Sequence, residues 1–562
     1  MVLLDALRSH PLGVKLGKLI PAQAWEKRPS LFFGLAAFTL VSSLLLGGGT
    51  RGGFLSDAIL ELLAIPAFLM SLSMLFAAQR TERNRPPQFA LLLCFATALL
   101  PLLQLVPLPP FIWQWLPQRE EILTVFELAG AGLPWLPISV APNATWLSAL
   151  SLLPPLAVFL GVLQMSYRER RHLSLILLGV GIVGAMVGLL QVAQGPSSPL
   201  RFFAFTNEYE AVGFFANRNH FAALLYMLVL YGAAWATDLA FTAGSWRDLR
   251  SLDTSIIAAL TASLLAVVIL IAAETVSRSR AGLGLMIVAM FGAFALPSMD
   301  LRKKAGVTPV KLMIVATIVA VLLVVQFALY RILDRFATDP LQDARIIFAH
   351  NTMTAALAYL PFGSGFGTFG SVYPMFEAAK DTLANIYANH AHDDVLEVCL
   401  EGGATALALI ALFVTWLVLR AKAIWRRPPT HVRPIDVLLA RAATLAIGLL
   451  IAHSFVDYPL RTDAMMVVLA FSCALLIEPF RGTEDTVAAA MRFESVSSGR
   501  NESLLESPPV FSPASAASPD LPQASGPAAR PPAGERWGEN IAWPEEWSKS
   551  KPQKSGVKEG DG

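Results

Sequence analysis

The sequence predicts an all-α, polytopic membrane protein with about twelve transmembrane helices. Two observations predict this fold class. Hydrophobic residues make up 55% of the 562 residues and charged residues only 15%, whereas soluble domains carry roughly 25% charged residues. The apolar residues also gather in stretches of the length that a membrane-spanning helix needs, about 20 residues. We therefore expect most of the chain to lie in a lipid bilayer.

The candidate spans follow one another as far as the apolar pattern continues. Two of them are marginal, because the one near Phe54 carries Asp57 and Glu61 at its start and the one near Gly282 is short. No small-x-small cleavage pattern follows the first span, so we expect it to be uncleaved rather than a signal peptide. The spans begin near Leu31, Phe54, Phe89, Ala144, Leu173, Phe221, Ser255, Gly282, Leu312, Val395, Asp436 and Ala464.

Lys and Arg are concentrated in every second connection between these spans. Cytoplasmic connections carry such an excess in membrane proteins, so both chain termini are expected in the cytoplasm. The enriched connections hold Arg80, Arg83, Arg85, Arg168, Arg170, Arg171, Arg247, Arg250, Arg302, Lys303, Lys304, Lys311, Arg420, Lys422, Arg426, Arg427 and Arg433. The formal net charge of the whole chain is only +2. It provides no global field that would attract nucleic acid, and no nucleic-acid partner is expected.

Two connections on the opposite, outer side are long enough to carry function. The segment from Pro109 to Pro142 is rich in Trp and Pro, and its aromatic residues suit the headgroup layer of a membrane. The segment 333–394, between the ninth and tenth spans, places many Phe and Tyr residues among glycines, which is too aromatic for a disordered linker. We expect this large loop to form a packed lid at the membrane surface.

The chain divides into three parts by composition. Residues 1–29 are expected to form an amphipathic cytoplasmic arm, and residues 30–480 the transmembrane domain. Ser, Pro, Ala, Glu and Lys replace the apolar pattern over residues 481–562, which indicates a disordered cytoplasmic tail. The aromatic and acidic end of this tail could be a docking motif, but a tolerated extension is the favoured interpretation. The three cysteines lie in apolar runs without metal-site or disulfide spacing.

Four polar clusters stand at the outer ends of the spans. They cover residues 215–220 (FANRNH), 277–280 (SRSR), 343–345 (DAR) and 389–394 (NHAHDD). Charged groups near membrane helices are costly, so a functional role is their default interpretation. Because the charge bias places all four clusters on the same side, we expect them to form one site.

The residue types in these clusters suit transfer chemistry on an anionic lipid headgroup. The planar guanidinium of Arg makes bidentate hydrogen bonds with phosphate and keeps its charge. Histidine adds a base that can take a proton from a hydroxyl near neutral pH. Only His390, His392, Asp393 and Asp394 resemble metal ligands, and because the arginines can neutralise a diphosphate, no metal is expected.

The clusters belong to longer motifs, which occur in this order: FANRNHFA, TVSRSRAGL, ARIIFAHNTMTAALAYLPFGSGFGTF, NHAHDDVLEVCLEGG and HSFVDYPLR. Together they resemble the O-antigen ligase and Wzy-type polysaccharide polymerase superfamily, over about residues 137–476. The resemblance implies a membrane glycosyltransferase of the GT-C class in the bacterial inner membrane. Such enzymes move a glycan from undecaprenyl diphosphate to an acceptor hydroxyl at the periplasmic face, with inversion and without a cofactor. The implied partners are this donor, a glycan or lipid A-core acceptor, and a chain-length regulator.

The resemblance also implies roles for individual residues. Arg218 and Arg280 match the arginines that bind the diphosphate, and His392 matches the catalytic base. Arg345 is a candidate third contact to substrate, and His390 and Asp393 complete the candidate substrate-binding set. Two positions depart from the family pattern. Asp393 stands where Asn, Ser or Gln is usual. Its carboxylate could raise the pKa of His392 or orient that side chain, or the change could be a local variation without effect. Ala406 stands where Gly is commoner.

Several alternatives remain at this point. Within the glycosyltransferases we favour a polymerase of exopolysaccharide, capsule or O-antigen, with a ligase to lipid A core and a protein O-oligosaccharyltransferase as alternatives. A transporter or flippase is the alternative of a different class, although no internal repeat supports it. His220 is expected to be a polar helix start, and His453 with Asp457 a structural pair. The GxGxxG pattern at Gly365 follows no predicted strand, so its glycines more plausibly allow tight turns.

Overall fold

The computed structural model describes residues 29–50, 53–78, 87–204, 206–243, 254–297, 344–379, 388–429 and 432–479. Within these ranges the regular secondary structure is helical, apart from one isolated β-bridge between Leu108 and Leu136. The predicted cytoplasmic arm, the span near Leu312, segments 333–343 and 380–387 of the large loop, and the predicted tail all lie outside the described residues. Most of the basic connections from which we expect both termini in the cytoplasm also lie outside the described residues.

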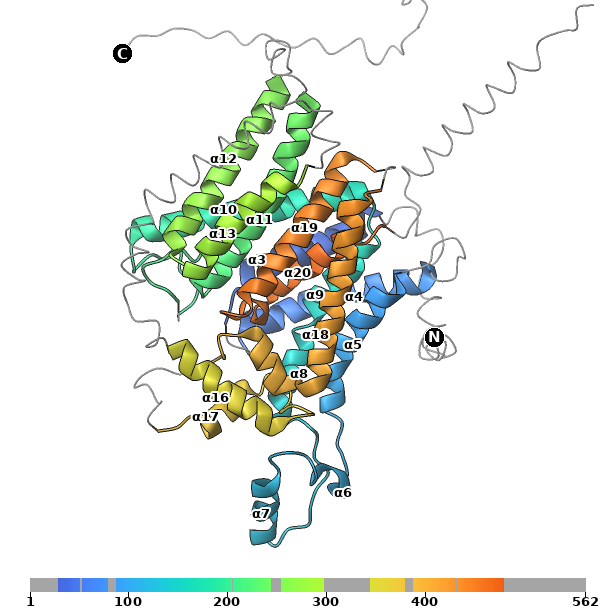
Figure 1. Cartoon of the computed structure of the whole chain (residues 1–562), viewed down its shortest axis with the longest axis vertical. Helices are drawn as coiled ribbons and strands as arrows, with labels where there is room; N and C mark the ends of the chain where they lie inside the picture. Colours follow the sequence, from blue (N-terminus) through green and yellow to red (C-terminus); the bar gives the residue numbers. More distant parts are fainter. Residues whose placement is uncertain are drawn as a thin grey trace, which may run out of the picture. The chain divides into compact units, whose positions relative to one another are not determined.

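Long apolar helices make up most of the described chain (Figure 1). Seven are long and apolar enough to cross a membrane: α4 (Leu55–Ala78), α8 with α9 (Pro142–Leu150, Leu153–Leu163), α10 (Tyr167–Gln194), α11 (Arg218–Ala243), α12 (Thr254–Ser277), α18 (Asp394–Arg426) and α19 (Pro434–His453). Shorter apolar helices are α3 (Pro29–Leu46), α5 (Gln88–Gln104), α13 (Arg280–Ala295) and α20 (Asp463–Leu475).

Each predicted span except the one near Leu312 coincides with one of these helices. The all-helical prediction is therefore confirmed for the described residues, and the fold is compatible with a polytopic membrane protein. A total of about twelve spans stays a prediction, as does the GT-C class.

Helix α11 lies at the centre of the apolar core and packs against α10, α12, α13 and α19. Its contact with the preceding helix depends on small residues along α10, where a Cβ added at Gly181 would overlap Leu228 and one at Gly188 would lie 3.0 Å from Phe221. Small residues let membrane helices approach closely. The first turn of α11, which carries the FANRNH motif, is thereby fixed against its neighbours.

The described part of the large loop is packed, as its aromatic content predicts. Helices α16 (Ala344–Tyr359) and α17 (Phe369–Phe376) lie at one end of the long helices (Figure 1). Phe348, Tyr359, Phe369 and Tyr373 form a small buried core with residues at the start of α18. This core holds α16 against the site described below.

The glycines between α16 and α17 act as turn residues, as predicted, and not as a nucleotide-binding loop. Gly365 and Gly367 have φ angles of 109° and 78°, which non-glycine residues rarely adopt. A Cβ at Gly365 would also lie 2.6 Å from Oγ of Ser139. Gly365 therefore lets the lid approach the segment that leads into α8, and Gly367 lets it approach α8 itself.

The connection between α5 and α8, which is predicted to lie on the outer side, contains α6 (Pro110–Trp113) and α7 (Glu120–Leu128). Trp113 is fully buried and donates a hydrogen bond to the carbonyl of Pro134 at 2.8 Å. Trp115 and Trp135 are exposed. Only the latter two therefore remain available for the predicted interfacial role.

Candidate active site

His392 lies beside the buried carboxylate of Asp457. Its Nδ1 is 3.3 Å from Oδ1 of Asp457, and its ring stacks on Phe348 at a centroid distance of 6.1 Å. The backbone of His392 has a φ of 55°, which is uncommon for a residue with a side chain. Nε2 makes no hydrogen bond within the described part of the chain, and the side chain keeps 21% exposure. A histidine held in this way presents Nε2 outward.

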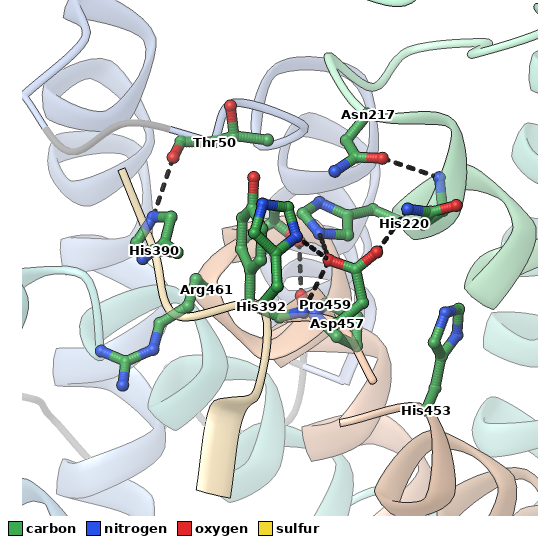
Figure 2. Close-up of polar contacts among 12 residues, drawn as sticks. Thr50, Asn217, His220, His390, His392, His453, Asp457, Pro459 and Arg461 are labelled. Atoms are coloured by element: carbon green, nitrogen blue, oxygen red, sulfur yellow. Dashed lines mark hydrogen bonds and ion pairs between the residues drawn. The ribbon is translucent and has the colours of Figure 1, made fainter. Parts of the chain in front are cut away.

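Asp457 is the point where the separate motifs meet (Figure 2). It is fully buried in the turn after α19. Its Oδ2 accepts a hydrogen bond from Nδ2 of Asn219 and lies 3.4 Å from Nη2 of Arg345, while Nε2 of His220 lies 3.9 Å from Oδ1. Three motifs far apart in sequence therefore contact the carboxylate that a fourth motif supplies.

The surroundings of Asp457 keep its carboxylate ionised. Burial by itself raises the pKa of this group, but the hydrogen bond from His392 and the positive charge of Arg345 outweigh it. The pKa of Asp457 therefore lies well below its ordinary value of 3.8. An ionised carboxylate at Nδ1 fixes the orientation of an imidazole and stabilises its protonated form.

His390 is held differently from His392. Its Nδ1 lies 2.8 Å from Oε1 of Glu397 and its Nε2 lies 2.9 Å from the carbonyl oxygen of Thr50. Both neighbours are acceptors, so both ring nitrogens carry protons in this arrangement. Burial lowers the pKa of His390, but Glu397 reverses the effect and the pKa is raised above 6.5. His390 is therefore a structural cation rather than a base.

Tyr458 separates the two histidines. Its ring centroid lies 4.4 Å from that of His390 and 4.8 Å from that of His392, and it also packs edge-on against His220 at 4.7 Å. The phenol is buried, and burial raises its pKa. The tyrosine therefore stays protonated and serves as the wall between the two imidazoles.

A network of buried carboxylates lies behind His390. Arg461 Nη1 is 2.6 Å from Oε2 of Glu401, and its Nε is 3.5 Å from Glu397 and 3.6 Å from Asp394. The three acidic residues are on the first turns of α18, so one guanidinium fixes this helix end against the turn after α19. The negative charge around Arg461 raises its pKa further, despite burial.

The two arginine motifs meet at Glu210. Nη1 of Arg218, the first residue of α11, lies 2.7 Å from Oε1 of Glu210, and Nη1 of Arg278 lies 3.9 Å from the same oxygen. Arg280 is exposed at the first residue of α13, whose N-cap is Ser279. The amide of Ala211 also donates to the carbonyl of Val276 at 3.2 Å. The SRSR turn is therefore joined to the segment that leads into α11.

Two details of the sequence interpretation change. Asp393 is the N-cap of α18 and accepts a hydrogen bond from the amide of Leu396 at 2.9 Å, so the carboxylate that faces His392 is the one of Asp457. His453 was expected to pair with Asp457; the amide of Asp457 does donate a hydrogen bond to the carbonyl of His453 at 3.0 Å, but Nδ1 of the His453 ring lies 3.3 Å from the hydroxyl of Tyr226. The two residues are therefore joined through the backbone of the turn, while the imidazole of His453 has Tyr226 as its partner.

Several of these residues could have been found from sequence. Glu397 and Glu401 are four residues apart on one predicted span, so they share a helix face, and acidic groups in a span call for a named partner. Arg461 lies in the HSFVDYPLR motif, but no feature of the sequence marks it as the partner of these carboxylates. Glu210 carries no comparable signal, because an acidic residue before a helix is usually solvated.

Among the described residues, no three His, Cys, Asp or Glu side chains converge as metal ligands would.

Comparison with known proteins identifies part of the chain. No curated protein matches the chain significantly. Residues 254–411 match the sequence model of a family described as O-Antigen ligase. The matched segment runs from α12 through the lid into α18 and includes Arg280, Arg345 and His392. Residues 254–411 of this helical, membrane-type protein therefore carry a domain of the O-antigen ligase family.

Proposed function

We propose that the protein transfers a glycan from a lipid diphosphate, expected to be undecaprenyl diphosphate, to an acceptor hydroxyl at the periplasmic face. The observation that carries this proposal is the pairing of His392 with ionised Asp457 next to a group of arginines. A base of this kind and an anion-binding group are the two parts that such a transfer requires. The family match at residues 254–411 supports the same reaction class.

His392 acts as the general base. Asp457 holds the proton on Nδ1, so Nε2 has a free lone pair and takes the proton of the acceptor hydroxyl. The acceptor oxygen then forms a bond to the anomeric carbon of the donor. The bond between that carbon and the diphosphate oxygen breaks, and its electron pair leaves with the diphosphate. A single displacement inverts the configuration at the anomeric carbon.

The arginines stabilise the negative charge that grows on the leaving diphosphate. Arg218 and Arg280 are the proposed direct contacts, and Arg345 is the proposed third. Arg218 is held at Glu210 and Arg345 at Asp457, so both guanidinium groups are positioned before substrate binds. Preorganised charges of this kind need little rearrangement in the transition state. We expect the reaction to proceed without a metal.

The experiment is complementation of a deletion strain with variants of the full chain. His392→Ala and Arg280→Ala should fail to restore long glycan chains, while His350→Ala should restore them. His350 lies exposed on α16 and serves as a matched histidine control on the lid. Full complementation by His392→Ala would overturn the proposed site.

The same strain separates the candidate acceptors. Single repeats attached to lipid A core in the deletion strain indicate a polymerase, which is the proposed activity. Full-length polymer that accumulates on its carrier lipid indicates a ligase instead. Transfer by the purified protein in detergent without any ion gradient would argue against a transporter or flippase, which needs two compartments.

A further inference from the structure

A short segment before α11 supplies a carboxylate that two arginines share. Glu210 is buried, with 7% of its surface exposed. Its Oε1 lies 2.7 Å from Nη1 of Arg218 and 3.9 Å from Nη1 of Arg278. The two arginine side chains keep 23% and 30% exposure, so both retain surface at which an anion can bind. A phosphate bound there would share its cations with Glu210.

The backbone of Arg278 has an unusual conformation. Its φ is 53°, a value that residues with a side chain rarely adopt and that is concentrated at functional sites. Arg278 lies in the turn between α12 and α13. The amide of Ala211 donates to the carbonyl of Val276 at 3.2 Å, so this turn is bonded to the segment that carries Glu210. The strained residue therefore belongs to the same unit as the shared carboxylate.

The backbone of this segment is held by contacts that do not involve the charge of Glu210. Nη1 of Arg201 donates to the carbonyls of Asn207 and Glu210, at 2.7 and 3.0 Å. Oδ1 of Asn207 accepts a hydrogen bond from the amide of Arg218 at 2.9 Å. Segment 207–210 is thus fixed against the first turn of α11. A glutamine at position 210 would keep this arrangement and still offer an oxygen to Arg218, but it would carry no charge.

The arginines adjoin the proposed base. Asn219 follows Arg218 in the first turn of α11, and its Nδ2 donates a hydrogen bond to Oδ2 of Asp457. Oδ1 of Asp457 lies 3.3 Å from Nδ1 of His392. Consecutive contacts therefore join Arg218 to the base, and Glu210 acts on a cation within the proposed site.

The proposed transfer makes the diphosphate more negative. In the donor each phosphate is esterified and carries one charge. When the bond to the sugar breaks, its electron pair stays on the terminal phosphate, which gains a further charge near neutral pH because the second pKa of such a phosphate is about 6. Arginines that stabilise the leaving group therefore also hold the product more tightly than the donor. Slow product release limits many enzymes.

We propose that Glu210 is a positioning residue that limits how tightly the arginines hold the lipid-diphosphate product, and that Arg278 is a further arginine of this group. The inference rests on the proposed glycan transfer and deepens it. Glu210 aligns Arg218 for the donor. Its charge repels the product more than the donor, because the product carries the additional charge, and so it speeds release.

The test measures binding of farnesyl diphosphate, which is chemically a lipid diphosphate of the product type, to the full-length protein in phosphatidylcholine nanodiscs. Glu210→Gln should bind it about tenfold more tightly than wild type, because a neighbouring like charge is removed. A merely structural role for Glu210 would weaken binding instead. Equal or weaker binding by Glu210→Gln would therefore overturn the role of Glu210.

Three controls locate the effect. Glu208→Gln removes an exposed carboxylate two residues earlier and should bind like wild type. Arg278→Gln should bind farnesyl diphosphate about tenfold less tightly, and unchanged binding would exclude Arg278 from the group. Farnesol has the same chain without a charge, so its binding should be equal in all variants. Tighter binding of farnesol by Glu210→Gln would show that charge is not the cause.

Kinetics test the step on which Glu210 acts. In the transfer assay, Glu210→Gln should give a burst of one transfer per protein molecule, followed by a slower steady state, since burst kinetics separate chemistry from product release. The ratio of the first-turnover rate to the steady-state rate should exceed that of wild type. An unchanged ratio, with tighter binding, would overturn the role in release.

Failure of this inference differs from failure of the proposed function. Wild-type protein that binds farnesyl diphosphate no better than farnesol would overturn both, since no diphosphate would be recognised. Diphosphate-dependent binding that Glu210→Gln leaves unchanged would overturn the inference alone. Tighter binding by Glu210→Gln, together with normal transfer by His392→Ala, would overturn the proposed base and support the role of Glu210.

Discussion

Replacing Asp457 by Asn removes one charge from the centre of the site and keeps the side-chain shape. Oδ1 of Asp457 faces Nδ1 of His392 and the amide of Tyr458, and Oδ2 faces Arg345 and Asn219. Whichever way the asparagine amide turns, its NH2 group meets a donor. In one orientation His392 loses its Nδ1 partner. In both orientations it loses the charge that stabilises its protonated form.

The expected loss follows from the role of the base. General base catalysis contributes roughly 10²–10⁴ in rate, so Asp457→Asn should lower the transfer rate by a factor in this range. In activation free energy this is about 3–5 kcal/mol. Because Asp457 acts through His392, the double variant with His392→Ala should be little slower than His392→Ala alone.

The assay is transfer from a lipid-diphosphate-linked glycan by purified full-length protein, with rates normalised to monodisperse protein. Glu127→Gln, which neutralises an exposed carboxylate on α7, is the control and should transfer at the wild-type rate. Wild-type transfer by Asp457→Asn would refute the reasoning. So would fully additive losses in the double variant, because two residues that act as a unit cannot lose their contributions independently.

Four further predictions concern the rest of the site. Arg218→Lys should lower the transfer rate about tenfold or more, since a lysine cannot form a bidentate contact with phosphate; an unchanged rate would exclude such a contact. The fold favours the charged form of His390. The stability that this residue contributes to the folded protein should therefore be complete below pH 6.5 and lost as the pH rises through the raised pKa of His390. Thermal unfolding of wild type and His390→Asn across this range should therefore converge at high pH, and parallel curves would contradict the assignment. Arg461→Met leaves three buried carboxylates without their cation and should destabilise the protein by about 3–5 kcal/mol, measured as a lower unfolding temperature; an unchanged temperature would show that the network is not stabilising. Gly403→Ala combines a φ of 60° with overlap against the carbonyl of Pro361, so it should reduce the yield of folded protein, whereas Ala406→Gly on the same helix should express normally.

The sequence by itself determined the class of fold and most of the helix positions. Long apolar stretches can bury backbone polar groups in a bilayer only as helices, so composition and stretch length are sufficient for that prediction. The same local information identified the motifs around Arg218, Arg280 and His392. The aromatic content of the large loop was likewise enough to predict packing for the part that contains α16 and α17.

Only the tertiary structure decided how the motifs pair. Asp393 lies next to His392 in sequence, but the N-cap geometry of α18 directs its carboxylate to the amide of Leu396. Asp457 is 65 residues away and reaches the histidine because α18 and α19 pack side by side. The division of labour between the two histidines has the same origin, since Glu397 and Thr50 occupy both nitrogens of His390. Sequence spacing restricts contacts only within one element, whereas contacts between helices depend on how their faces pack.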